Sequence, residues 1–270
     1  MSHETVLRLG VFLGVLIVMA LAEAIFPRRA RRQSRLNRWS INLALVVLGA
    51  LAIRLLIPLA AVGAAMIADA RGIGLFNLLN WPSAAGILLS VMLLDLAIYA
   101  QHVAFHRVPV LWRMHRMHHS DLELDVTSGL RFHPAEYLLS MAIKIGVVLA
   151  LGAPAAAVVI FEVLLNATAM FNHGNLRLPG WLDRALRTVL VTPDFHIVHH
   201  STERAEHDRN FGFNLTWWDY LFRTYQARPA KGPVALDVGL APWRAPGQLT
   251  LPKLLIQPFI DPPPVAGRTS

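Results

Sequence analysis

The 270-residue chain contains no cysteine, and only 16% of its residues are charged. Without thiols it can form no disulfide, no thiolate metal site and no iron–sulfur cluster. A charged fraction well below the roughly 25% of soluble domains, together with 55% hydrophobic residues, excludes an ordinary soluble domain. The sequence also has no basic motif interleaved with aromatic residues, so we expect no nucleic acid partner. The composition therefore predicts an integral membrane protein.

Four apolar runs are long enough to cross or deeply enter a bilayer with a hydrocarbon core of about 30 Å. They cover approximately residues 5–26, 41–68, 84–100 and 137–171. The last run is interrupted by Gly152-Ala153-Pro154, which predicts two apolar helices joined by a tight turn, since proline breaks a helix. A re-entrant hairpin and two full spans both fit this run. The fold class is an all-α integral membrane protein with about four transmembrane helices or hairpin halves and a cytosolic helical cap.

Six arginines lie between Arg28 and Arg38, directly after the first apolar run. A cleaved signal peptide is the alternative for that run, but its length and Glu4 favour a membrane helix. The positive-inside rule places the arginines in the cytoplasm, and attraction to anionic lipid headgroups explains the net charge of +8. Counting spans then puts both ends of the 137–171 segment on the cytoplasmic side. We expect a multi-pass protein of a bacterial inner membrane or the eukaryotic endoplasmic reticulum.

Ten of the twelve histidines lie beside these apolar runs, and neutral imidazole is the commonest transition-metal ligand in proteins. They are His102, His106, His115, His118, His119, His133, His173, His196, His199 and His200. A single histidine is usually a core residue, but the repeated HxxHH motif favours a metal site. On a helix, positions i, i+3 and i+4 share a face, so each motif is predicted to present three imidazoles in one direction. This exceeds the need of one zinc ion and predicts two metal ions between converging helices. His207 is expected at a loop or surface.

Carboxylates near the histidines are expected to orient the imidazoles by accepting their remaining ring N–H groups. The candidates are Asp121, Asp125, Glu136 and Asp194. Helix capping or solvation is an equally good interpretation of each. Asp95 lies two helical turns before His102 and is a further candidate.

The strings HVAFH, LWRMHRMHHSDLELDVTSGLRFHPAE, FNHGN, TPDFHIVHHS and NFGFNLTWWDYLFRTY follow one another between residues 95 and 225. Together they resemble the fatty acid hydroxylase/sterol desaturase superfamily. The HxxxH, HxxHH, HxxHH pattern is specific to it, and His133 and His173 fall where the group has further motif histidines. Arg223 departs from the more usual glycine but lies outside the ligand set.

The resemblance implies a membrane-embedded di-iron oxygenase that uses O2 on an unactivated C–H bond of a lipid. All ten histidines above are its implied ligands. The expected cofactors are two iron ions, although zinc competes for nitrogen sites. Hydroxylation of a sterol, fatty-acyl or ether lipid is favoured, and lipid desaturation is the alternative. A metal-binding or transport protein without oxygenase activity is the alternative from another class. A metalloprotease is improbable because there is no HExxH motif.

The implied reaction consumes two electrons, yet the sequence contains no haem, flavin or iron–sulfur motif. A separate cytochrome, ferredoxin or reductase, or a pterin, is therefore expected as electron donor. We expect a single oxygenase domain, in which residues 1–82 form the N-terminal membrane helices, 83–225 the histidine core and 226–270 a proline-rich tail.

Overall fold

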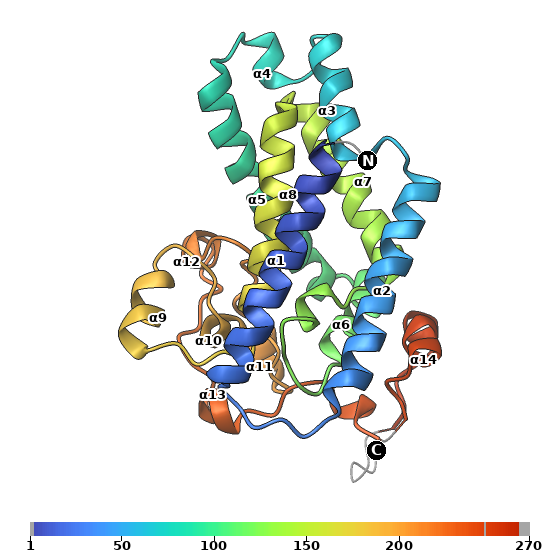
Figure 1. Ribbon diagram of the computed structural model, residues 1–270, viewed down its shortest axis with the longest axis vertical. Coiled ribbons are helices and arrows are strands. Elements are labelled where there is room, and N and C mark those ends of the chain that lie inside the picture. The colour runs from blue at the N-terminus through green and yellow to red at the C-terminus, as the bar shows by residue number, and fades with distance from the viewer. Residues whose placement is uncertain (1–2, 246, 265–270) are drawn as a thin grey trace.

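The computed structural model describes residues 3–245 and 247–264, and within them the regular secondary structure is helical apart from three isolated β-bridges (Figure 1). The long helices are α1 (His3–Ile25), α2 (Arg35–Leu56), α5 (Ser83–Arg107), α7 (Pro134–Leu151) and α8 (Ala155–Asn172). The shorter ones are α3 (Ala60–Ala70), α4 (Leu75–Leu78), α6 (Pro109–His119), η1 (Ser128–Leu130), α9 (Gly180–Leu186), α10 (Pro193–His196), α11 (Arg204–His207), α12 (Trp217–Leu221), α13 (Gly232–Ala235), η2 (Ala241–Trp243), α14 (Leu251–Ile256) and η3 (Gln257–Phe259). The all-α prediction is confirmed.

By length and composition, five helical stretches of the described chain could cross a membrane. They are Glu4–Ile25, Arg35–Leu78, Ala84–Arg107, Pro134–Leu151 and Ala155–Asn172. The second stretch comprises α2, α3 and α4, and the last two arise from the single run expected at 137–171. The number exceeds the four predicted runs because that run divides, as its Gly-Ala-Pro interruption predicted.

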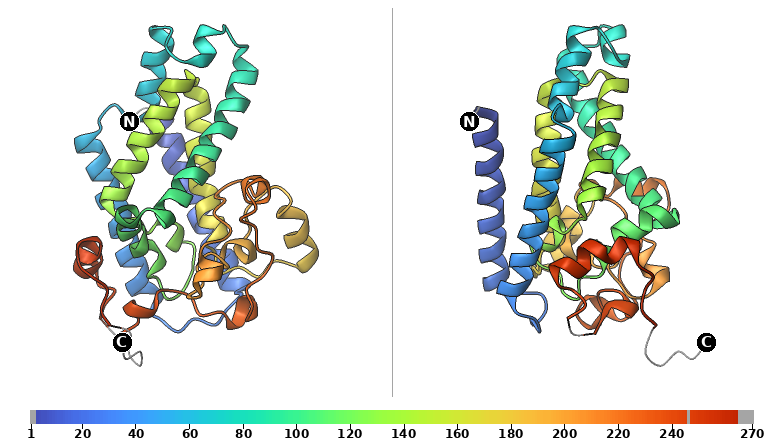
Figure 2. Two further views of the ribbon diagram at one scale, coloured as in Figure 1. Left: turned by 180° about the vertical axis from the view of Figure 1, so that it is seen from behind. Right: turned by 90° about the vertical axis from the view of Figure 1, so that its right-hand side faces the viewer.

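The long helices form a bundle, and the short elements from α6 onward gather at one end of it (Figures 1 and 2). We call these short elements the cap. The arginine-rich segment 26–34, which joins α1 to α2, lies at the cap end. Helix α5 leads down into the cap, and α7 and α8 leave it and return to it. The arginines, the ends of the hairpin and the histidine motifs therefore share one end of the bundle.

The tight turn between α7 and α8 depends on glycine. Gly152 ends α7 with φ +65°, a backbone conformation that only glycine adopts without strain. Gly74, before α4, packs so closely that a Cβ there would lie 2.1 Å from the Gly152 backbone nitrogen. These two glycines let the α3–α4 turn seat against the tip of the hairpin. The core beside them contains Leu94, Val148 and Phe161.

The break between α5 and α6 positions the first two histidine motifs. Helix α5 ends at Arg107, and Pro109 starts α6 at its first turn, where a missing N–H costs nothing. The chain turns at Val108, so the last turn of α5 and the last two turns of α6 face each other. The predicted tail also packs on the cap: Arg113 of α6 donates to the Pro258 carbonyl, and Leu254 is fully buried.

Candidate metal centre

Nine buried histidines form two groups at the cap end of the bundle, where the last turns of α5 meet the cap. Within each group, one nitrogen from every ring lies within 4.8 Å of one nitrogen from every other ring. The first group is His102, His106, His115, His119 and His199. The second group is His118, His173, His196 and His200. The groups touch each other, since the His118 and His119 rings lie 5.2 Å apart and the His119 and His200 rings 4.6 Å apart.

Each HxxHH motif contributes to both groups, which corrects the expectation that its three imidazoles point in one direction. On α6, His115 and His119 are four residues apart and join the first group, whereas His118 joins the second. The other motif divides the opposite way: His196 and His200 join the second group and His199 the first. On α6, His118 and His119 differ by about 100° around the helix axis, so they lie on either side of the boundary between the groups. His199 and His200 divide in the same way in the turn that follows α10, which ends at His196.

Backbone carbonyls fix the orientation of four of the rings. The Nδ1–H groups of His102, His173 and His199 donate to the carbonyls of Phe211, Ala169 and Arg209 at 2.7, 2.9 and 2.8 Å. His118 makes a longer bond of 3.3 Å to the Arg131 carbonyl. A ring that donates through Nδ1 carries its lone pair on Nε2. These rings therefore turn their acceptor nitrogens toward the other imidazoles.

The nitrogen positions fit shared metal ions. In the second group the Nε2 atom of His173 lies 3.1 Å from that of His118 and 3.2 Å from that of His196. Two nitrogens bound to one ion at about 2.0–2.1 Å lie about 3.0–3.4 Å apart, so these separations suit a common ion. In the first group the Nε2 atoms of His102, His115 and His199 are buried without a hydrogen-bond partner. Buried lone pairs without donors are costly, and a cation would satisfy them.

Burial keeps the imidazoles of the cap neutral. Loss of solvation lowers the pKa of His173 to about 3, although its bond to Ala169 acts in the opposite direction. Desolvation, reinforced by neighbouring rings, holds the pKa of His115, His118 and His199 well below the ordinary value. Neutral imidazole is the form that binds metals, so the rings are ready to bind at neutral pH.

Of the four predicted carboxylates, only Glu136 contacts a histidine of the groups. Its Oε1 atom accepts the Nδ1–H of His115 at 2.7 Å, deep in the cap. Asp121 and Asp125 instead bind the guanidinium of Arg38 on α2. Asp194 pairs with Arg28 at 2.7 Å, although it is only two residues from His196.

Asp95 accepts hydrogen bonds from the Trp218 indole and the Leu215 N–H, and so holds the 211–218 segment in place. Its effect on His102 is indirect, through the carbonyl of Phe211 in that segment.

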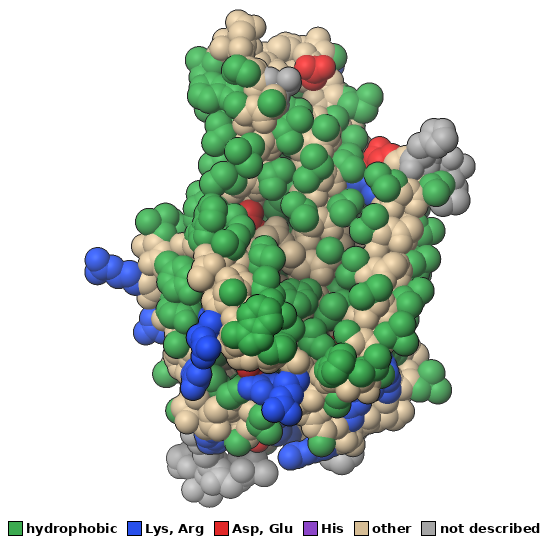
Figure 3. All heavy atoms as spheres, turned by 60° about the vertical axis from the view of Figure 1, so that its left-hand side comes forward, with side chains coloured by type: hydrophobic (Ala, Val, Ile, Leu, Met, Phe, Trp, Pro, Cys, Tyr) green, Lys and Arg blue, Asp and Glu red, His purple; other side chains and the backbone are tan. Residues whose placement is uncertain are grey.

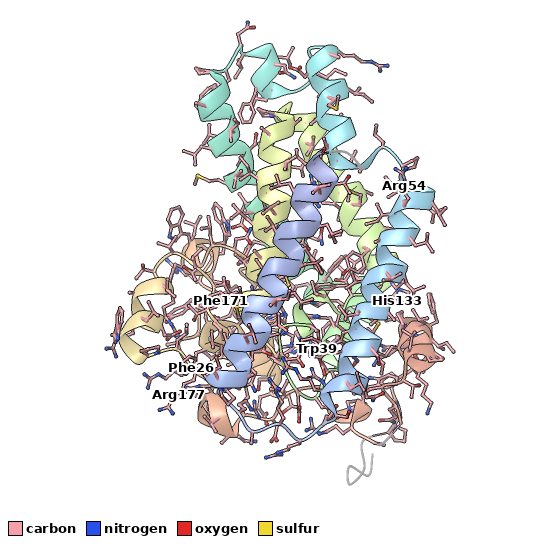
Figure 4. The ribbon with its side chains drawn as sticks, in the orientation of Figure 1. Phe26, Trp39, Arg54, His133, Phe171 and Arg177 are labelled. Carbon is pink, nitrogen blue, oxygen red and sulfur yellow. The ribbon has the colours of Figure 1, made fainter. Side chains whose placement is uncertain are left out.

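His133 lies apart from both groups and is the one predicted ligand that the structure does not bring to them. Figure 4 shows it near α2 and α14. It is the N-cap of α7: its Nδ1 accepts from the Ala135 N–H, and its Nε2 donates to the Leu255 carbonyl. Because both ring nitrogens are engaged, His133 has no free lone pair for a metal.

His207 is buried beside the first group, so its predicted placement at the surface is wrong. Its ring centroid lies 4.5 Å from that of His119 and 4.7 Å from that of His106, and Trp112 packs against it at 4.8 Å. The next residue, Asp208, lies 3.5 Å from Nδ1 of His106. Its polar neighbours in the string EHDRN suggested exposure, and no spacing rule linked this segment to α5.

The comparisons with known proteins agree with this architecture. The profile of the fatty acid hydroxylase family matches residues 87–224, about half of the chain. The chain belongs to this family. It is 32% identical over 181 residues to the ornithine lipid hydroxylase OlsE of Rhizobium tropici, an alignment that covers 67% of this chain and 52% of the relative. It is 26% identical over 162 residues to the human alkylglycerol monooxygenase, covering 58% of this chain and 34% of that protein.

A fatty acid hydroxylase of Lecanicillium, vlmA, is 25% identical over 185 residues, covering 60% of this chain and 48% of the relative. The chain thus spans about half the length, or less, of these curated relatives. No solved structure matches. The fatty acid hydroxylase family match contains all nine grouped histidines, and these relatives are named as lipid hydroxylases or monooxygenases, which supports an oxygenase role.

Proposed function

We propose that the chain is an O2-dependent di-iron lipid oxygenase, most simply a hydroxylase. The observation that carries the proposal is the pair of adjacent groups of buried, neutral imidazoles, each with nitrogen separations that suit a shared ion: His106 and His119 at 3.1 Å in the first group, and His173 with His118 and His196 in the second. An all-nitrogen shell favours iron over magnesium or calcium, which prefer oxygen ligands. Family membership and the names of the relatives support the reaction class.

Two bound ferrous ions would supply the reduction of O2 and the insertion of one oxygen atom into a C–H bond. The balance of hydroxylation requires two further electrons and two protons, and releases one water. Residues of the chain have three tasks in this. The nine imidazoles would bind the ions, and carbonyls such as those of Phe211 and Arg209 hold the rings in position. Glu136 makes the ring of His115 a stronger metal ligand by accepting a hydrogen bond from its Nδ1–H.

The substrate class we propose is a membrane lipid with a long alkyl chain, such as a sterol, fatty-acyl or ether lipid. The relatives named for ornithine lipid, alkylglycerol and fatty acid support a lipid of this kind. Desaturation is the alternative outcome at the same site, and product mass separates the two: hydroxylation adds one oxygen atom, whereas desaturation removes two hydrogens. A separate cytochrome, ferredoxin or reductase, or a pterin, supplies the electrons.

The catalytic core we propose is residues 83–225, with 1–82 as membrane helices and 226–270 as a tail. The family match at 87–224 lies inside this core and supports the division. Residues 246 and 265–270 of the tail lie outside the described residues.

Metal content tests the proposal. Protein purified in detergent from iron-replete cells should contain about two iron ions per chain by mass spectrometry of metals. His118→Ala and His199→Ala each remove one ligand from one group, so both should lose iron and lower lipid oxidation by more than about a hundredfold, beyond the effect of an outer partner. His133→Ala is the matched control and should keep its iron. Zinc alone after iron loading, or His-dependent metal flux into vesicles, would support a metal-binding or transport protein instead.

We also propose that the cap and its histidines lie on the cytoplasmic face. The arginines between Arg28 and Arg38 lie at the cap end, whereas Arg71 follows α3 at the opposite end. Because the chain has no cysteine, single substitutions provide clean reporters. In intact cells a membrane-impermeant maleimide should label Arg71→Cys and should not label Arg228→Cys until the membrane is opened. The reverse pattern would invert the topology.

A further inference from the structure

A cavity of about 160 Å³ opens at the cap end of the bundle, beside the segment that joins α1 to α2. Four of its lining residues are arginines, namely Arg29, Arg31, Arg32 and Arg244, and two are acids, Glu123 and Asp237. We call it the arginine pocket. It holds several water-sized groups, since one water takes about 30 Å³ of liquid volume, and is thus large enough for a phosphate or carboxylate group.

The charges of the arginine pocket do not cancel. Asp237 is already paired outside it with Lys231 at 3.3 Å, and Glu123 accepts from the backbone N–H of Arg32. Arg31 lies 3.5 Å from the buried carboxylate of Glu23. Glu123 and Asp237 act on Arg29 through their charge, but among the described residues the guanidiniums of Arg29 and Arg32 form no salt bridge. Four arginines line the pocket against these two acids, so it carries an excess of positive charge.

Within the arginine pocket, the chain holds Arg29 in place and leaves one of its hydrogen-bond donors without a partner. Asn175 clamps the backbone of Arg29 by accepting its N–H and donating to its carbonyl, both at 2.9 Å. One guanidinium nitrogen of Arg29, Nη2, donates to the Leu236 carbonyl, while the other, Nη1, is buried without a partner. Burial, reinforced by the charge of Arg32, lowers the pKa of Arg29 although Asp237 and Glu123 act in the opposite direction, and a bound anion would add to their effect. An anion in the pocket would satisfy both the donor and the charge.

The position of the pocket matches the boundary between membrane and water. Ile25 and Phe26 precede the arginines and are 66% and 60% exposed, and Leu36 follows them at 82%. Figure 3 shows Lys and Arg side chains gathered at the cap end, below a face covered with apolar side chains. An anionic group at this depth, with apolar side chains on both sides of it, is in the position of a lipid headgroup.

We propose that the arginine pocket binds the anionic headgroup, phosphate or carboxylate, of a membrane lipid. A second, water-sized cavity of about 20 Å³ shares Arg29, Leu124 and Asn175 with it. That cavity is also lined by Asn172 and Gly174, which flank His173, and by Ile197, which follows His196. The headgroup is therefore bound next to the second histidine group. That the bound lipid is the substrate rests on the proposed function, whereas binding itself does not.

The test is a calorimetric titration of the full-length protein in neutral detergent, with a short-chain phosphatidic acid as the probe. The same titration uses a short-chain phosphatidylcholine and inorganic phosphate. We expect phosphatidic acid to bind at least about tenfold more tightly than either, because only it combines an uncompensated anion with acyl chains. Protein stripped of metal by a chelator should bind equally well, so the result does not depend on the proposed oxygenase activity.

Arg29→Gln and Arg32→Gln should each weaken binding of phosphatidic acid about tenfold or more. Arg32→Gln removes a side chain with no hydrogen bond in the described structure, so it keeps the test valid if Arg29→Gln fails to fold. Arg71→Gln is the matched control, since it removes the same charge from the opposite end and should change affinity less than about twofold.

Inorganic phosphate binding as tightly as the lipid would identify a free-anion site and overturn the headgroup assignment. Equal losses in all three variants, or no loss in either pocket variant, would also overturn it.

Discussion

Two buried polar clusters lie next to each other at the cap end of the bundle. They differ in whether their polar groups have partners within the chain. In the first, Arg38 of α2 binds Asp121, Asp125 and the Ser128 hydroxyl, so donors meet acceptors. Arg131 is the second cation beside Asp121, so two guanidiniums balance two carboxylates. In the second, nine neutral imidazoles face one another, and seven of their nitrogens have no partner. The first cluster is closed by the chain itself, whereas the second is complete only with a cation. This difference separates a structural network from a binding site among residues of equal burial.

The Arg38 cluster also holds the second histidine group in place. Asn42 on α2 donates to Thr127 and accepts from Arg131, and the carbonyl of Arg131 accepts the Nδ1–H of His118. Burial opposes ionisation of Asp121, but the guanidiniums of Arg38 and Arg131 overcome it and hold the pKa of that carboxyl below its usual range. Ionised Asp121 thus holds α2 against the segment that positions the second histidine group.

Of the substitutions discussed here, removing Arg38 should change the stability of the protein most. Arg38→Ala leaves Asp121 and Asp125 buried without their main cation, at a cost of about 3–5 kcal/mol in the free energy of unfolding. We expect a lower thermal unfolding temperature in detergent, and loss of bound metal because the cap loosens. Arg38→Lys keeps the charge and should recover part of the stability. If Arg38→Ala were as stable as the parent protein, the network would not be the support that we describe.

Glu136 differs from the carboxylates of the Arg38 cluster, since its buried side chain has an imidazole of the first group as its partner instead of a guanidinium. Glu136→Gln keeps an oxygen to accept the Nδ1–H of His115 but removes the charge, so metal affinity should fall about 10- to 100-fold. Competition with a coloured chelator measures this affinity. Glu136→Ala removes the acceptor as well and should cost more. Equal affinity in Glu136→Gln and the parent would show that orientation alone, and not charge, is what Glu136 provides.

Local sequence patterns were enough to predict the membrane helices and nine of the ten histidines expected as ligands. Apolar length, the Gly152–Pro154 interruption and the HxxHH motif are properties of short segments. The structure agrees with the first two, and it brings the HxxHH histidines together but divides each motif between the two groups. The partners of Asp121 and Asp194 could not be predicted, because both are arginines more than 80 residues away in the sequence. His133 resembled a ligand because its neighbours match the family motif, but it serves as a helix cap and a contact to Leu255.

His207 tests whether the metal centre has ligands beyond the nine grouped histidines. Its ring stacks parallel to that of His199 at 6.0 Å and packs against His119, yet it belongs to neither of the two groups. With His106 and Asp208 it forms a third set whose possible ligand atoms lie within 4.8 Å of one another. Burial lowers the pKa of His207 to about 4, so at neutral pH its ring adds no charge to the site. His207→Ala should therefore keep both irons and reduce lipid oxidation only a few-fold through looser packing, which His207→Phe should partly restore. Loss of one iron in both variants would make His207 a tenth ligand and extend the first group through the adjacent Asp208, which lies 3.5 Å from His106.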